Sequence, residues 1–87
     1  MGIKRRQSDA SSEERRWKRA IIACLTASLE DADVRKNDLA VRLGWTPRQV
    51  YNLFQGRKTV RVVDLILIAK ALRVSPELLF GRIIRWR

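Results

Sequence analysis

The chain has 87 residues, with 19 lysines and arginines against 9 aspartates and glutamates, a formal net charge of +10. A chain of this length forms one small domain, and its 46% of hydrophobic residues is too high for a disordered tail. The single cysteine cannot form an internal disulfide, and without histidine the zinc sites and hydrolase triads built on these residues are excluded. We therefore expect no enzyme, no metal and no cofactor, but a polyanionic partner such as nucleic acid or an anionic membrane.

The first eleven residues show no hydrophobic periodicity and contain the basic run Lys4, Arg5 and Arg6. We predict that residues 1–11 form a flexible basic arm. No apolar segment follows them, as a secretory signal would require. No apolar run reaches the roughly 18 residues of a transmembrane helix, so we expect a cytoplasmic protein outside the membrane.

A first helix is predicted from about Ser12 to Asp31. Ser11 and Glu14 have the spacing of a capping box, in which two side chains satisfy the first backbone N–H groups of a helix. One face of this helix collects apolar and small residues at helical spacing: Trp17, Ile21, Cys24, Leu25, Ser28 and Leu29. This face is expected to pack into the core, which makes Cys24 a buried and unreactive thiol.

Two short helices separated by a glycine turn are predicted next. The second helix includes residues 39–43, with Asp33 as a candidate N-cap. Gly44 ends it, because glycine readily adopts the positive φ of a helix end. The Thr46–Pro47 pair then starts a third helix, with threonine as N-cap and proline at the first helical position, where its missing N–H costs nothing. Gly56 closes this helix.

The remaining sequence predicts two more helices. A basic loop at residues 57–61 leads to a helix over residues 62–73, and the Ser75–Pro76 pair starts a fifth helix that Gly81 is expected to end. No strand-like alternation of useful length is present, so the prediction is an all-α domain of five helices. The expected layout is an arm at residues 1–11, a domain at residues 12–81 and a tail at residues 82–87.

The order of helix, glycine turn, Thr-Pro cap and helix between Leu39 and Gly56 is typical of a helix-turn-helix. The run from Leu39 to Gly81 resembles the lambda-repressor/Cro-like helix-turn-helix family. The resemblance rests on LAVRLG at 39–44, Gly56, IAKAL at 68–72 and VSPELLF at 74–80. The chain departs from the family pattern at Lys36 (usually Gln), Phe54 (commonly Glu) and Val60–Arg61 (often Pro-Ser).

The resemblance implies a compact five-helix lambda-repressor-like domain that binds a palindromic double-stranded DNA operator as a homodimer, as a repressor or Cro-like transcriptional regulator. The charge distribution agrees independently. Residues 35–61 contain seven basic residues against one acidic residue, a net charge of +6, whereas residues 62–81 are neutral. The basic arm is then expected to add affinity by reaching a groove or phosphates.

The predicted third helix carries polar side chains on the side away from its apolar residues. Arg48 and Asn52 are four residues apart on one face, where arginine can pair with guanine and asparagine with adenine. Together with the resemblance, this predicts the base-reading residues Pro47, Arg48, Gln49 and Asn52. Phosphate contacts, which set register without reading sequence, are expected from Lys36, Thr46, Tyr51, Arg57, Lys58 and Arg61.

More apolar residues are present near the C-terminus than a core of this size requires, which indicates self-association. The expected dimer contacts are Val63 and Leu67 on the fourth helix, with Ile83, Ile84 and Trp86 in the tail. In the resembling family the C-terminal part commonly forms the two-fold contact, which favours a dimer. The alternative is that the tail covers the core of its own chain.

An alternative function is a helix-turn-helix module that binds another protein, such as an antitoxin or antiactivator, with DNA binding secondary. The apolar stripe and the tail would then contact that protein. Binding of the arm and tail to a membrane surface is a weaker alternative, because no predicted helix has a basic face opposite a fully apolar one.

Overall fold

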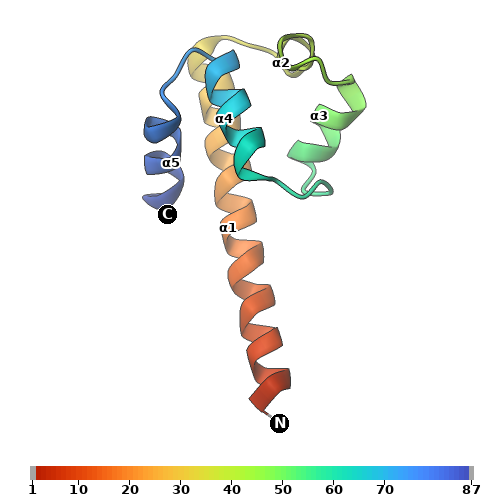
Figure 1. The fold of residues 1–87 in the computed structure, drawn as a ribbon, viewed down its shortest axis with the longest axis vertical. Coiled ribbons are helices and arrows are strands. Elements are labelled where there is room, and N and C mark those ends of the chain that lie inside the picture. Colours follow the sequence, from red (N-terminus) through yellow and green to blue (C-terminus); the bar gives the residue numbers. More distant parts are fainter. Residues whose placement is uncertain (1, 87) are drawn as a thin grey trace.

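The computed structural model describes the backbone of residues 2–86 and the side chains of residues 12–86. In that part of the chain all regular secondary structure is α-helical (Figure 1). The helices are α1 (Gly2–Ala32), α2 (Lys36–Leu43), α3 (Pro47–Phe54), α4 (Val62–Ala71) and α5 (Pro76–Ile84). The prediction of an all-α helix-turn-helix fold is confirmed.

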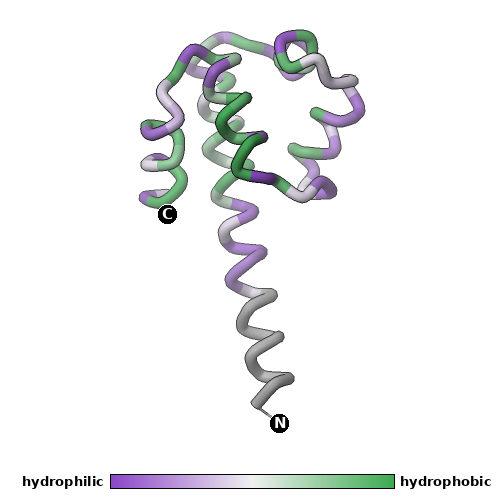
Figure 2. The backbone as a smooth tube through the Cα atoms, viewed as in Figure 1, coloured by the Kyte–Doolittle hydropathy of each residue, from purple (hydrophilic) through white to green (hydrophobic). Residues whose placement is uncertain are grey.

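The core lies where the C-terminal half of α1 meets the other helices. Helix α5 packs against α1 and α4, α2 packs against α3 and α4, and α3 also contacts α1. The α2–α3 pair and α5 therefore lie on opposite sides of the bundle (Figure 1). Every helix supplies a fully buried side chain: Leu25, Leu39, Val50, Leu53, Ile68 and Leu79. Figure 2 shows hydrophobic residues along α4, α5 and the C-terminal half of α1. Burying each large apolar side chain is worth about 1.5–3 kcal/mol.

Helix α1 buries the face that the periodicity predicted. Cys24, Leu25, Ser28 and Leu29 are all at most 5% exposed, and burial raises the pKa of the Cys24 thiol despite the opposing charge of Arg82. This agrees with a structural rather than a reactive cysteine. The face ends at Trp17, which is 37% exposed and lies at the margin of the core.

The start of α1 differs from the prediction. Its backbone is helical from Gly2, although the capping pattern predicted a start near Ser12 after a flexible arm. Extending an existing helix is far easier than starting one, and Lys, Arg and Gln favour helix, so a local capping pattern does not by itself stop the helix upstream. The side chains of Lys4, Arg5 and Arg6 lie outside the described residues.

Asp33 ends α1 and does not cap α2, so its predicted role is wrong. Its φ is 55°, and the Val34 N–H donates to the Leu29 carbonyl at 2.9 Å, as in a Schellman motif. The N-cap of α2 is Arg35, whose N–H donates to the Asp38 carboxylate at 3.4 Å. The same 6→1 bond recurs after α2, α3 and α4. In each case the donor is the N–H of the residue that follows one with positive φ, namely Gly44, Gly56 or Arg73.

Gly81 does not end α5, which corrects a second prediction. The helix continues through Gly81 to Ile84, because the apolar register of Leu79 repeats four residues later at Ile83. Ile83 is 5% exposed and belongs to the core cluster. It is therefore a core residue of its own chain and not a dimer contact, whereas Ile84 and Trp86 are exposed.

Gly81 lies inside a helix, whereas Gly44 ends one with a positive φ, so substitution by alanine is expected to change stability in opposite directions at the two positions. Gly81→Ala is expected to raise the free energy of unfolding by about 0.5–1 kcal/mol, because Gly81 lies inside a helix. The added Cβ would meet the Arg85 Nη2 atom at 2.8 Å, the far end of a flexible side chain that can move aside.

Urea denaturation measures the effect, with Gly44→Ala as the matched control. Gly44→Ala is expected to lower the free energy of unfolding by about 1–2 kcal/mol, because Gly44 has a φ of 71°, which a residue with a Cβ adopts only at a cost. A loss of similar size in Gly81→Ala would mean that Gly81 adopts a helix-ending conformation.

Candidate nucleic-acid interface

The turn between α2 and α3 is fixed by local hydrogen bonds. Gly44 adopts the left-handed conformation, and the Trp45 N–H donates to the Ala40 carbonyl at 2.9 Å. Thr46 and Gln49 then form a reciprocal capping box. The Gln49 N–H donates to Thr46 Oγ1 at 3.2 Å, and the Thr46 N–H donates to Gln49 Oε1 at 2.8 Å. The predicted Thr-Pro start of α3 is confirmed.

Helix α3 buries one face and presents the other. Val50 and Leu53 are fully buried and Phe54 is 8% exposed. The opposite face collects polar side chains at helical spacing: Arg48, Tyr51, Asn52 and Gln55. Arg48 and Gln55 are exposed, Tyr51 is 51% exposed and Asn52 is partly exposed.

The predicted base-reading residues do not occupy equivalent positions. Arg48 and Asn52 lie together on the outward face, whereas Pro47 and Gln49 lie toward its two edges. The side-chain oxygen of Gln49 is also engaged by the Thr46 N–H. Gln55 was not among the predicted residues, although it follows Arg48 by seven residues, the spacing that returns to the same face of a helix.

Two departures from the family pattern contact each other. The Lys36 ammonium lies 4.9 Å from the centroid of the Phe54 ring, a cation–π contact between the start of α2 and the end of α3. Lys36 remains exposed. Its charge is thereby held beside α3, and its role in phosphate contact stays a prediction.

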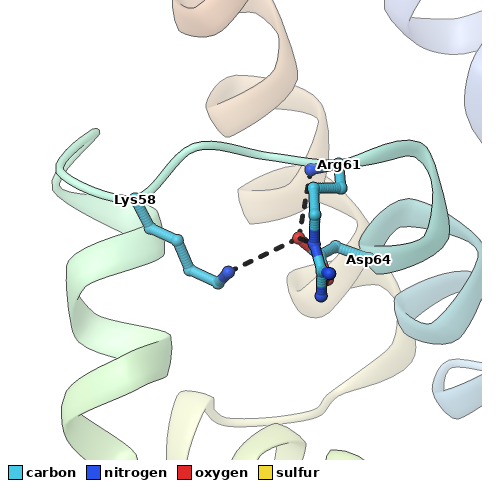
Figure 3. Close-up of polar contacts among 3 residues, drawn as sticks. All are labelled: Lys58, Arg61 and Asp64. Atoms are coloured by element: carbon cyan, nitrogen blue, oxygen red, sulfur yellow. Dashed lines mark hydrogen bonds and ion pairs between the residues drawn. The ribbon is translucent and has the colours of Figure 1, made fainter.

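A buried carboxylate organises the loop between α3 and α4 (Figure 3). Asp64 is 0% exposed, and its Oδ2 accepts from the Arg61 backbone N–H at 3.0 Å. Its Oδ1 pairs with Arg61 Nη2 at 3.0 Å, while Lys58 Nζ lies 3.5 Å from Oδ2. The Lys58 ammonium also lies 5.2 Å from the Trp45 ring centroid. The loop is thus tied to the first turn of α4.

The ion pairs determine the charge state of Asp64. Burial by itself raises the pKa of this carboxyl, but the hydrogen bonds from Arg61 and the charges of Lys58 and Arg61 outweigh burial. The pKa of Asp64 therefore lies below its ordinary value, and the carboxylate stays ionised at neutral pH. Asp64 was not among the predicted site residues, although a carboxylate three positions after a helix N-cap has capping-box spacing.

These contacts change the expected set of phosphate-binding residues. Lys58 and Arg61 were predicted to contact phosphates, but both cations have Asp64 as a partner. Arg42, part of the same basic cluster, donates to the Ala71 carbonyl at the end of α4 at 2.9 Å. The phosphate-contact prediction depends most on the remaining exposed members, Lys36, Thr46, Tyr51 and Arg57.

In the described part of the chain no helix is both long and apolar enough to cross a bilayer. Residues 13–79 match the model of a family described as a helix-turn-helix domain. No curated protein and no solved structure matches the chain significantly. The matched segment takes in the C-terminal part of α1, all of α2, α3 and α4, and the buried Leu79 of α5. The chain therefore belongs to the helix-turn-helix domain family of DNA-binding proteins.

Proposed function

We propose that the protein is a sequence-specific transcriptional regulator of the lambda-repressor/Cro type, which binds a palindromic operator as a homodimer. The observation that carries this proposal is the outward face of α3. Its polar side chains stand on a helix whose start is capped and whose other face is fully buried. A rigid helix of this kind fits a major groove about 12 Å wide.

The side chains of this face differ in what they can recognise. Arg48 donates two hydrogen bonds to the O6 and N7 atoms of guanine, and Asn52 and Gln55 each pair through their amides with adenine. Lys36 and Arg57 bind phosphates and orient α3 without reading sequence. The ion pairs of Asp64 hold the loop after α3, and with it the position of Arg57, relative to α4.

Dimerisation is supported by an exposed apolar stripe on α4. Val63 is 46% exposed and Leu67, one turn later, is 42% exposed. A two-fold axis through this stripe would bury each side chain against its copy in the second chain. The dimer would then present two copies of α3 to one DNA duplex.

Selection from random duplexes is expected to return a two-fold symmetric site. Its half-site centres should be about 10–10.5 base pairs apart, or a multiple of that, because both recognition helices must face the same side of the duplex. Enrichment of asymmetric sites alone, or of none, would contradict the proposal.

Light scattering tests whether the α4 stripe forms the dimer interface. Leu67→Glu is expected to yield monomers and to weaken binding to the selected site. The matched control is Val41→Glu, an apolar residue of α2 that is 81% exposed and lies outside the stripe. A Leu67→Glu protein that remains dimeric would show that the dimer interface lies outside this stripe.

A further inference from the structure

A groove runs along α1 beside the C-terminal end of α5, and the DNA-binding function leaves it unused. One part, of about 540 Å³, includes Trp17, Ala20, Ile84 and Trp86 in its lining. A second part, of about 530 Å³, continues along α1 past Cys24 and also includes Trp86. Trp86 borders both parts, so they adjoin at its ring, and we refer to them together as the groove.

The floor of the groove is an apolar stripe of α1. Its members recur at helical spacing: Trp17, Ala20, Cys24 and Ala27. Trp17 is 37% exposed and Trp86 is 45% exposed, so both rings present apolar surface to solvent. The indole N–H of Trp17 donates to Glu13 Oε1 at 3.2 Å, which satisfies its polar atom. Exposed tryptophans beside a depression are typical of protein-binding surfaces.

The rim of the groove is strongly basic. Its lining contains four arginines, Arg16, Arg19, Arg82 and Arg85, against one carboxylate, Asp31. Asp31 pairs with Arg82 at 3.6 Å. Arg85 donates to the Gly81 carbonyl at 3.2 Å, which holds its side chain along α5.

The charge decides between two kinds of occupant. A second copy of this chain would bring the same arginines face to face across a two-fold axis, which is unfavourable. A helix with an apolar stripe flanked by carboxylates would instead match both the floor and the rim. We propose that this groove binds an acidic amphipathic helix of another protein. The stretch of α1 from Trp17 to Asp31 is about 21 Å long, which accommodates about 14 residues of a partner helix.

The position of the groove is compatible with simultaneous DNA binding. It is formed by α1 and α5, whereas α2 and α3 carry the proposed DNA-binding face on the opposite side of the bundle (Figure 1). A protein bound there would join the regulator on its operator without displacing it.

The test is selection of peptides on the intact protein from a displayed library of randomised helical peptides about 14 residues long. The enriched peptides are expected to carry apolar residues at i, i+3 or i+4 and i+7, and a net negative charge. Binding of an enriched peptide should shift the fluorescence of Trp17 and Trp86, a change that persists in a Trp45→Phe background.

Substitutions of groove residues test whether the enriched peptide binds in the groove. Trp86→Ala and Arg19→Glu are each expected to weaken peptide binding at least tenfold while the circular dichroism stays unchanged. Arg19→Glu is also expected to leave operator affinity unchanged. Lys70→Glu, an exposed residue of α4, changes the net charge as much as Arg19→Glu and is expected to leave peptide binding unchanged.

Four outcomes would overturn the proposal. They are no enrichment, enrichment of neutral or basic peptides, conversion of a dimer to a monomer by Trp86→Ala, and an equal loss of operator and peptide affinity in Arg19→Glu. The third outcome would identify a second copy of this chain as the occupant of the groove, and the fourth would identify DNA as the occupant.

Discussion

Asp64→Ala is expected to lower the free energy of unfolding by about 2–3 kcal/mol. The change removes the acceptor of the Arg61 backbone N–H and the partner of two cations. A loss of 3–5 kcal/mol is typical when a fully buried ion pair is broken. The smaller value is expected here because the Lys58 and Arg61 side chains are 27% and 65% exposed and stay hydrated after the change.

Urea denaturation at pH 7 measures this loss, and Asp38→Ala is its matched control. Asp38 occupies the same position in the first turn of α2 and accepts from the Arg35 N–H at 3.4 Å, but it is exposed. The control is expected to cost less than about 1 kcal/mol. Equal losses in the two variants would show that burial of Asp64 contributes nothing beyond capping.

The same carboxylate contributes to the acid sensitivity of the fold. Its pKa is lowered in the folded state, so its contribution is fully present above the pKa of the unfolded chain, about 3.9. The contribution is lost as the pH falls through the lower folded pKa. The stability difference between the wild type and Asp64→Asn should therefore narrow below about pH 4. A difference that stays constant down to pH 2 would contradict the ion pair.

On the DNA side, Arg48→Ala and Asn52→Ala are each expected to weaken binding to the selected operator by about 1–3 kcal/mol. Each should also relax the preference at one base pair, because removing a base-reading side chain leaves that base unrecognised. Quantitative binding to a panel of single-base variants of the operator measures both effects. Gln55→Ala is expected to behave in the same way, since Gln55, the C-cap of α3, continues the face that carries Arg48 and Asn52.

The control for base reading is Lys36→Ala. A residue that contacts phosphate should weaken binding to all sequences alike and reduce the salt-dependence exponent by about 1. If Lys36→Ala changed which bases are preferred while Arg48→Ala did not, the two roles would have to be exchanged.

The sequence alone was sufficient for the helix-turn-helix itself. Gly44, the Thr46–Pro47 pair and Gly56 act through the backbone conformation of their own positions, and the structure places the turn, the cap and the end of α3 where these residues predicted. Arg48 and Asn52 share a face for an equally local reason, the period of a helix. Local signals are reliable where no distant residue competes with them.

The tertiary structure decided the features in which distant contacts outweigh local preference. Gly81 remains helical because Ile83 is needed in the core, and Asp33 ends α1 because Val34 packs against the same core. The contact of Lys36 with Phe54 joins two helices, and the basic groove exists only where α5 lies along α1. In each case the free energy comes from burial, or from a pair of charges or rings that folding brings together, and both depend on contacts between segments that are far apart in the chain.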